Sequence, residues 1–175
     1  MSGTPDIRES TQADTAAIES LYPQAFPDED LVSLVHSLLR DKPVRLSLVA
    51  TLGEQLVGHV MFTHCDIDAD DSKTALLGPL AVKPAHQRQG IGSAIVNEGL
   101  RRLKEAGVTM VLVLGDPAYY GRLGFTADEN VLPPYELPDD WAGAWQSQYL
   151  VASDSRVAGR LLVPVQWRQV ALWSP

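Results

Sequence analysis

The stretch Leu80-Ala81-Val82-Lys83-Pro84-Ala85-His86-Gln87-Arg88-Gln89-Gly90-Ile91-Gly92-Ser93 decides the fold, because it runs from a strand through a polar loop into a helix. The apolar run from Thr74 to Val82 predicts a buried strand, which ends at Lys83-Pro84 because proline has no amide to donate to a ladder. A helix is expected from Gly90 to about Gly107. Apolar or small residues recur there at helical spacing: Ile91, Ile95, Gly99 and Leu103.

The first turn of this helix carries no negative side chain. Basic residues complement the C-terminal end instead: Arg101, Arg102 and Lys104. No Asp or Glu precedes Glu98 in the helix, so free N–H groups and about half a positive charge are left at its start. Arg88 adds a full charge, and Gly90 and Gly92 let a ligand approach the backbone. The turn therefore predicts an anion-binding site.

Two segments carry a family resemblance. Gln87-Arg88-Gln89-Gly90-Ile91-Gly92 resembles the Gln/Arg-x-x-Gly-x-Gly/Ala signature of the GNAT superfamily of N-acetyltransferases, and Leu80–Pro84 precedes it as that family's fourth strand does. Downstream, Tyr119–Phe125 is similar to the family's Phe/Tyr-Tyr-x-Lys/Arg-x-Gly-Phe segment. The resemblance extends from about Thr4 to Phe125, with sharp motifs only from Leu80 onward.

The resemblance implies transfer of an acetyl or other short acyl group from acetyl-CoA, as cosubstrate, to a primary amine by direct attack. It assigns pantetheine and thioester contacts to the backbone of Leu80, Ala81 and Val82. It assigns the pyrophosphate to a second set of residues: Gln87, Arg88, Gln89, Gly90, Ile91, Gly92 and Ser93. Tyr120 aligns with the second aromatic of the downstream segment and is expected to protonate the departing thiolate, with Tyr119 as the alternative.

The expected fold is mixed α/β and GNAT-like, with residues 1–175 as one domain. Strands and helices are expected in the order β, α, α, β, β, β, followed by a β-α-β unit. Strands are expected at 5–9, 45–51, 55–63, 74–82 and 108–114, with further strands at 149–152 and 160–163. The family likeness adds a mostly antiparallel twisted sheet, flanked by helices, in which the parallel strands 74–82 and 108–114 splay apart.

Local signals fill in the connections. A first helix is capped at Ser10 or Thr11 and runs to about Tyr22, and Asp28–Asp30 is expected at the start of a second helix. The acidic run Asp66–Asp71 predicts a solvated loop, and the Pro- and Trp-rich segment 131–146 predicts a loop or lid. Asp116 followed by proline predicts a helix cap rather than a cofactor contact.

Composition restricts the function further. The chain has 14 basic and 22 acidic residues among 175, a net charge of −8, which argues against nucleic acid as a partner. The single cysteine, Cys65, permits no intramolecular disulfide, and no apolar run approaches a bilayer span. We expect a cytoplasmic protein with a small-molecule or peptide amine as acceptor and no membrane partner. A monomer and a homodimer are both compatible with the sequence.

Other classes fit the glycine loop less well. A P-loop requires a lysine after its last glycine, and a dinucleotide fingerprint requires Gly or Ala where Ile95 stands. The histidines show no metal-ligand spacing, and no Gly-x-Ser-x-Gly is present. A non-catalytic acyl-CoA sensor or interaction module remains the alternative to an enzyme. The general base is open among weak candidates: Glu29, His36, His64, Asp66, Asp68, or a chain of water molecules.

Overall fold

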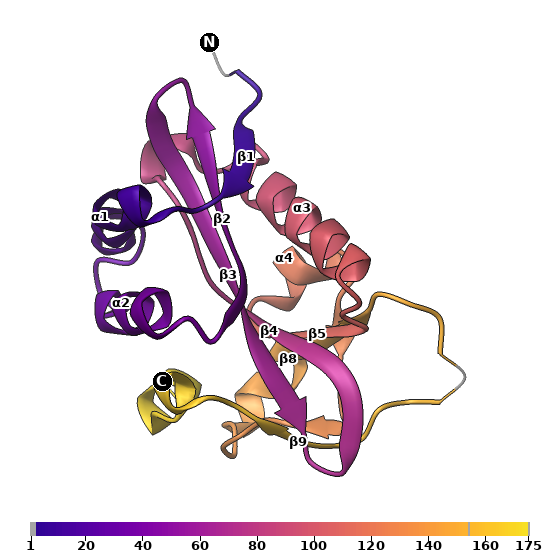
Figure 1. The fold of residues 1–175 in the computed structure, drawn as a ribbon. Coiled ribbons are helices and arrows are strands. Elements are labelled where there is room, and N and C mark those ends of the chain that lie inside the picture. The colour runs from indigo at the N-terminus through magenta and orange to yellow at the C-terminus, as the bar shows by residue number, and fades with distance from the viewer. Residues whose placement is uncertain (1–2, 154, 175) are drawn as a thin grey trace. The chain divides into compact units, whose positions relative to one another are not determined.

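The computed structural model describes residues 3–153 and 155–174 (Figure 1). It divides into two compact units, residues 1–62 with 78–101 and residues 63–77 with 102–175, which are described separately. The single-domain expectation stays a prediction. The strands are β1 (Asp6–Glu9), β2 (Val44–Leu52), β3 (Gln55–Ile67), β4 (Asp70–Val82), β5 (Met110–Leu114), β6 (Thr126–Ala127), β7 (Val131–Leu132), β8 (Trp145–Tyr149) and β9 (Gly159–Leu162). The α-helices are α1 (Thr15–Ala25), α2 (Val32–Asp41), α3 (Ile91–Glu105) and α4 (Pro117–Gly121).

The first unit is built on the strand order β1-β2-β3-β4. β1 pairs antiparallel with β2, from Asp6 opposite Thr51 to Glu9 opposite Leu48. The tight turn between β2 and β3 contains Gly53 at φ +60°, a conformation that glycine adopts without steric cost. The predicted hairpin around Leu52-Gly53-Glu54 is therefore confirmed.

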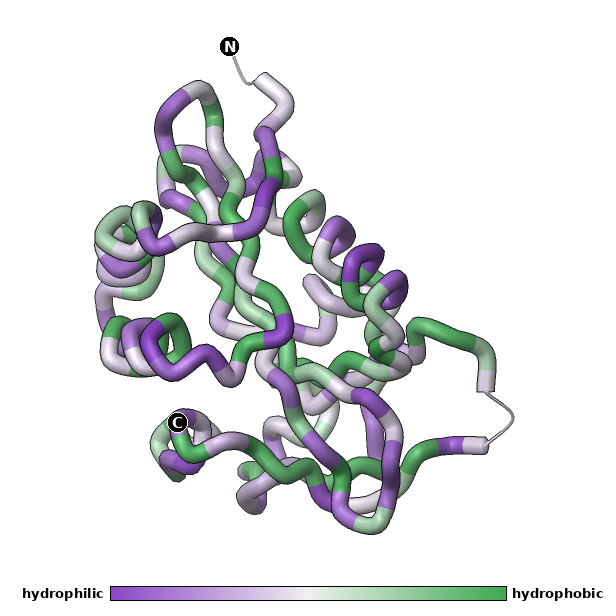
Figure 2. The backbone as a smooth tube through the Cα atoms, in the orientation of Figure 1, coloured by the Kyte–Doolittle hydropathy of each residue, from purple (hydrophilic) through white to green (hydrophobic). Residues whose placement is uncertain are grey.

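Helices cover both faces of the strands in this unit. Side chains of β3 alternate between the faces, so His59 meets Tyr22 of α1 while Phe62 meets Gly99 of α3. Figure 1 shows α1 and α2 side by side, with the strands between them and α3. Hydrophobic and hydrophilic stretches alternate along α3 (Figure 2), and Ile95 and Val96 are fully buried. The sequence-predicted helix is confirmed to within a turn at each end.

The second unit contains the parallel pair. β4 pairs with β5 in parallel. The paired stretch runs from Thr74 opposite Met110 to Leu76 opposite Leu112. β5 continues to Leu114, which is paired antiparallel with Trp145 of β8. β9 adds an antiparallel edge to the distal end of β3. The mixed α/β class and the mostly antiparallel sheet with β4 and β5 as a parallel pair are confirmed.

Three local predictions are wrong. The expected loop Asp66–Asp71 is a hairpin, because β3 runs to Ile67, β4 starts at Asp70 and Ala69 makes the turn at φ +63°. Asp28–Asp30 lies before α2 rather than in its first turn, since the helix begins at Val32. The strand expected at 149–152 lies earlier in the chain, because β8 spans Trp145–Tyr149. In the segment 131–146, Trp145 is 2 % exposed, and its indole N–H donates to the Val131 carbonyl at 2.7 Å.

Candidate active site

The loop between β4 and α3 is tied to the strand it leaves. The amide of Lys83 donates to the Val57 carbonyl at 2.8 Å, which extends the β3–β4 ladder by one residue past β4. A single 3-10 turn, Pro84–His86, follows. The Gln87 side-chain amide then reaches back to the Val82 carbonyl at 3.0 Å. These bonds fix where the polar loop begins its approach to the helix.

Two residues of the loop adopt left-handed backbone conformations. Arg88 has φ +63° and Gly90 has φ +85°. Residues in this region turn successive amides toward one concave side, a geometry that favours anions. A Cβ built on Gly90 would meet no atom within 4 Å, so the space in front of this residue is open. Arg88 is exposed beside it, where its guanidinium can reach a ligand.

Within residues 3–153 and 155–174, six consecutive backbone amides, from Arg88 to Ser93, have no acceptor. The first helical hydrogen bond of α3 runs from the Ala94 amide to the Gly90 carbonyl at 3.0 Å. Unpaired amides at a helix start carry the positive end of the helix dipole. The predicted residues from Gln87 to Ser93 are therefore brought together as one donor-rich turn.

The start of α3 is held against β3 by Ile91, which is 3 % exposed. A Cβ built on Gly58 would stand 3.3 Å from Ile91 Cγ2 and 3.6 Å from the Ala81 carbonyl oxygen. Gly58 therefore permits the close approach of the helix start to β3, beside the end of β4. Leu80, Ala81 and Val82 occupy that end; Ala81 is buried, and the other two are partly exposed.

Tyr120 belongs to the second unit, on the short helix α4. Asp116 caps this helix, as predicted, by accepting a hydrogen bond from the Ala118 amide at 2.9 Å. The Tyr120 ring makes edge-to-face contacts with Tyr119 and Phe125, at centroid distances of 5.0 and 5.7 Å. Burial is the main factor that raises the pKa of Tyr120 above its ordinary value. The hydroxyl therefore stays protonated at neutral pH and is available as a donor.

The candidate bases do not gather in one place. His36 pairs with Glu19 at 2.6 Å on the outer side of α1 and α2. His64 and Asp66 face each other at 3.4 Å on an exposed stretch of β3. Glu29 and Asp68 are exposed in turns. No geometry in either unit selects one of them as a base.

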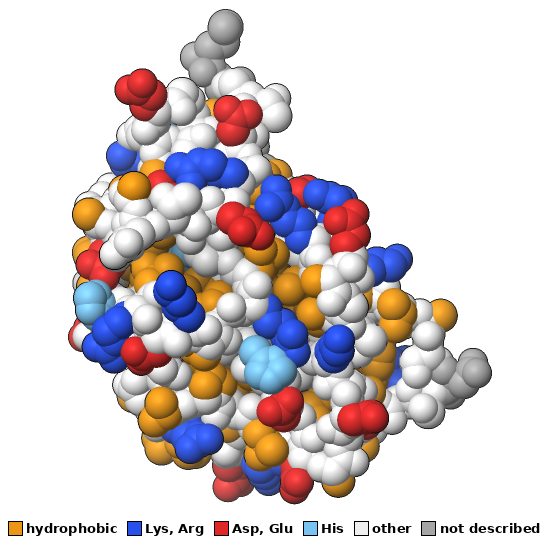
Figure 3. Space-filling model, viewed as in Figure 1, with side chains coloured by type: hydrophobic (Ala, Val, Ile, Leu, Met, Phe, Trp, Pro, Cys, Tyr) orange, Lys and Arg blue, Asp and Glu red, His pale blue; other side chains and the backbone are white. Residues whose placement is uncertain are grey.

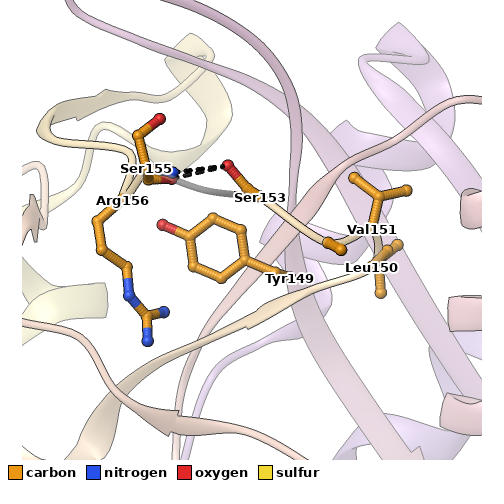
Figure 4. Close-up of a pocket in the computed structure, with 7 residues that line it drawn as sticks. Tyr149, Leu150, Val151, Ser153, Ser155 and Arg156 are labelled. Atoms are coloured by element: carbon orange, nitrogen blue, oxygen red, sulfur yellow. Dashed lines mark hydrogen bonds between the residues drawn. The ribbon is translucent and has the colours of Figure 1, made fainter.

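A shallow cavity of about 390 Å³ lies in the connection between β8 and β9 of the second unit. The Arg156 guanidinium lies over the Tyr149 ring at 5.3 Å from its centroid (Figure 4). The Val157 amide donates to the Tyr149 hydroxyl at 2.8 Å. These contacts pack the loop around Tyr149, and we interpret the cavity as a consequence of this packing.

Sequence reasoning missed a buried polar row in the first unit. His59 is fully buried, and its two ring nitrogens lie 2.7 Å from the Tyr22 hydroxyl and 3.0 Å from the Ser47 hydroxyl. A histidine inside the apolar run from Val57 to Phe62 was a signal that this position has buried partners. The partners themselves come from a helix and another strand, so sequence spacing could not name them.

The acetyltransferase (GNAT) family model matches residues 12–125, which include the donor-rich turn and α4. The chain belongs to the GNAT family of acetyltransferases. It is accordingly an acyltransferase. Among its relatives, YjhQ of Escherichia coli K12, described as an uncharacterized N-acetyltransferase, is 32% identical over 157 residues, 86% of this chain and 87% of YjhQ. YhbS of the same strain, described in the same words, is 38% identical over 138 residues, 78% of this chain and 80% of YhbS.

Solved structures agree with this assignment. The crystal structure of YhbS from Escherichia coli in complex with CoA has a TM-score of 0.87 and 30% identity, covering 97% of this chain and 94% of YhbS. A GNAT acetyltransferase from Brucella melitensis in complex with acetyl-CoA has a TM-score of 0.77 and 28% identity, covering 93% and 97% of the two chains. The fold recognised from the two sequence motifs is thus the observed one.

The described residues contain neither a candidate membrane span nor a cluster of metal ligands. No helix in this part of the chain is both long and apolar enough to cross a membrane. No three His, Cys, Asp or Glu side chains among residues 3–153 and 155–174 come together as metal ligands.

Proposed function

We propose that this acyltransferase moves an acetyl or other short acyl group from acetyl-CoA to a primary amine, which attacks the thioester directly in a ternary complex. The observation that carries the proposal is the row of six unpaired amides from Arg88 to Ser93. Such a row needs an acceptor with several oxygens in a small volume. A pyrophosphate meets that requirement, because its oxygens can accept from several amides at once.

The residues of the turn fit a pyrophosphate in charge and in shape. Gly90 leaves its surroundings open, and Arg88 supplies a guanidinium that can form charge-assisted hydrogen bonds. No carboxylate occurs in the first turn of α3. The site is therefore built to accept negative charge without an opposing side chain.

The end of β4 is proposed to hold the pantetheine arm and the thioester. Leu80, Ala81 and Val82 would bind through their backbone, as an added strand binds a sheet edge, so the amide dipoles of the arm would find partners. One of these N–H groups would face the thioester carbonyl as its oxygen gains charge during attack. This mode of binding demands little of the side chains, in keeping with the small Ala81.

Tyr120 is proposed as the acid that protonates the departing thiolate. Burial raises the pKa of Tyr120, so the hydroxyl carries its proton at neutral pH and can donate a hydrogen bond to the sulfur as negative charge develops there. The acceptor is proposed to be a small-molecule or peptide amine. The net charge of −8 is compatible with a cationic acceptor, since opposite charge raises its local concentration.

A turnover screen tests the proposal. Purified protein is mixed with acetyl-CoA and, separately, spermidine, lysine, kanamycin and a peptide with a free N-terminus, and free thiol is read against time. The proposal expects thiol release that depends on one class of amine, together with an acetylated product by mass spectrometry. Acetyl-CoA binding without turnover on any amine would favour the non-catalytic sensor instead.

A further inference from the structure

Gln87 is bonded to the end of β4 through its side chain and to the following loop through its backbone. Its side-chain amide donates to the Val82 carbonyl at 3.0 Å. Its backbone amide donates to the Pro84 carbonyl at 3.3 Å, and the amide before it, of His86, donates to the Lys83 carbonyl at 2.8 Å. Gln87 is therefore the residue at which the loop after β4 is closed on itself.

The way β4 ends presents the Val82 carbonyl to Gln87. A trans peptide group holds its N–H and its C=O on opposite sides. Because the Lys83 amide donates to the Val57 carbonyl of β3, the Val82 carbonyl of the same peptide group points away from β3. The glutamine side chain returns to this carbonyl from five residues further along the chain and has two N–H groups to donate. The Gln87 carboxamide thus bonds the strand end as a neighbouring strand would.

The residue that follows Gln87 has an unfavourable backbone conformation. Arg88 has φ +63°, in the left-handed region that residues with a Cβ seldom adopt, whereas Gln87 is extended, with φ −69° and ψ 157°. Such a conformation persists only where the surrounding structure enforces it. Gly90 is also left-handed, at φ +85°, but glycine adopts this region without steric cost. Arg88, unlike Gly90, therefore has to be held.

Side chains on both sides of Arg88 return to the loop. Gln87 does so at 3.0 Å, whereas the side-chain nitrogen of Gln89 lies 3.5 Å from the Ala85 carbonyl, at the outer limit for a hydrogen bond. The bond from Gln87 is the shorter of the two, and it belongs to the residue immediately before the left-handed one. It fixes the direction from which the chain enters Arg88.

The conformation at Arg88 decides where the amides of the turn point. A left-handed residue turns successive amides toward one concave side, and the amides from Arg88 to Ser93 are the donors proposed for the pyrophosphate. Charge alone does not mark this place, since Figure 3 shows Lys and Arg interspersed with Asp and Glu over the face that it draws. A turn that is already in shape also binds more tightly than one that the ligand has to order.

We infer that Gln87 is a positioning residue for the cofactor. Its side chain braces the turn through the Val82 carbonyl and holds Arg88 in the left-handed conformation in which the amides bind a pyrophosphate. The inference rests on the proposed function. The backbone of Gln87 stays part of the turn, while its side chain acts through Arg88 rather than by touching the cofactor.

Calorimetric titration of coenzyme A into Gln87→Met tests the brace. Methionine keeps the length of the side chain and cannot donate a hydrogen bond. Loss of one neutral hydrogen bond predicts an affinity about three- to tenfold weaker than that of wild type. In steady-state assays with whichever of spermidine, lysine, kanamycin or the peptide releases thiol fastest, KM for acetyl-CoA should rise by a similar factor. The kcat value should stay within twofold, since the brace acts before chemistry.

Gln24→Met is the matched control. Gln24 of α1 is also exposed, and its side-chain nitrogen donates to the Ser20 carbonyl at 3.0 Å, the same distance as in the brace. Because Gln24 lies outside the loop between β4 and α3, coenzyme A affinity should stay within twofold of wild type. An equal loss of affinity in Gln24→Met and Gln87→Met would overturn the inference.

A double-mutant cycle with Arg88→Gly locates where the brace acts. Glycine adopts φ +63° without steric cost, so the left-handed conformation then depends much less on Gln87. Arg88→Gly alone should weaken binding through loss of the guanidinium. Adding Gln87→Met to it should weaken binding by less than a further twofold, instead of the three- to tenfold seen with arginine in place.

Two results of the cycle would overturn the inference while leaving the cofactor site in place. One is an equal loss from Gln87→Met in both backgrounds, which would mean that Gln87 does not act through residue 88. The other is unchanged affinity in Gln87→Met, which would mean that the turn keeps its shape without the brace. Wild type that fails to bind coenzyme A would instead refute the proposed function, and the brace with it.

Discussion

The Tyr120 ring packs against Gly115, so that its carbon atoms occupy the space a Cβ at residue 115 would need, with Cε2 nearest and Cδ2 at 2.9 Å. The backbone of Gly115 cannot easily retreat. Its amide donates to the Ala144 carbonyl at 3.0 Å, and its own carbonyl accepts from the Gln146 side chain at 3.1 Å. The missing side chain at residue 115 therefore sets the position of the tyrosine.

The hydroxyl of Tyr120 is the part that the proposed chemistry uses. Tyr120→Phe keeps the ring and its contacts, so acetyl-CoA binding should persist while kcat falls about 10²-fold. Steady-state thiol release and calorimetric binding measure the two effects. Tyr119→Phe is the matched control; loss of turnover in that variant, with full turnover in Tyr120→Phe, would move the assignment by one residue.

Gly115→Ala should displace the Tyr120 ring without touching its hydroxyl. We expect a stability loss of about 1–3 kcal/mol from overpacking, measured by urea unfolding. Turnover should fall about tenfold or more, because a catalytic group displaced by an ångström loses much of its effect. Gly143→Ala controls for the substitution itself, since a Cβ there meets nothing within 4 Å. Wild-type turnover in a folded Gly115→Ala protein would show that the ring position does not matter.

Buried His59 should make stability fall as the solution is acidified. The unfolded chain binds a proton at this residue below pH 6.5, whereas the folded state stays neutral down to about pH 3. Because the unfolded state then binds more protons, the free energy of unfolding should drop by up to ~1.4 kcal/mol per pH unit across this window. Urea unfolding at pH 7, 6, 5 and 4 should show a shallower slope for His59→Gln than for wild type.

His64→Gln, at an exposed histidine, should keep the wild-type slope. A His59 ring that protonates near pH 6.5 in a folded-state NMR titration would contradict this account, whether or not the variant folds.

Acetyl-CoA should stabilise the fold, because it binds amides and strand backbone that only the folded chain presents together. At ~100 times its dissociation constant it should add roughly 2.7 kcal/mol to the free energy of unfolding. A thermal shift measured with acetyl-CoA, ATP and NAD tests this. A melting temperature that rises with ATP or NAD but ignores acetyl-CoA would favour nucleotide binding at the turn instead.

Sequence alone predicted the elements whose signals are local. The turn at Gly53, the cap at Asp116 and the apolar spacing from Ile91 to Leu103 each depend on neighbouring residues, and the structure has all three. The acidic stretch after Cys65 was misread because its charges suggested a loop. Buried Cys65 and Ile67 alternate there with exposed Asp66, which is the period of a strand rather than of a loop.

Features that depend on tertiary packing could not be predicted. Ser10, Tyr22, Ser47 and His59 come from four separate segments, and only folding places their polar atoms in one row. Trp145 gave a lid signal by composition, yet its place in β8 is set by pairing with Leu114. The motif residues were found because a helix start is a local structure, while the acceptor site has no local signature.

Calorimetric titration of coenzyme A into Gly90→Gln and Gly90→Glu tests the central claim most directly. Both variants share the backbone strain at φ +85° and the open space in front of residue 90, and they differ only in charge. If the turn holds the pyrophosphate, Gly90→Gln should stay within about tenfold of wild-type affinity, whereas the carboxylate of Gly90→Glu should cost at least ~10²-fold, or about 2.7 kcal/mol. Equal affinity in the two folded variants would place coenzyme A elsewhere and contradict the account.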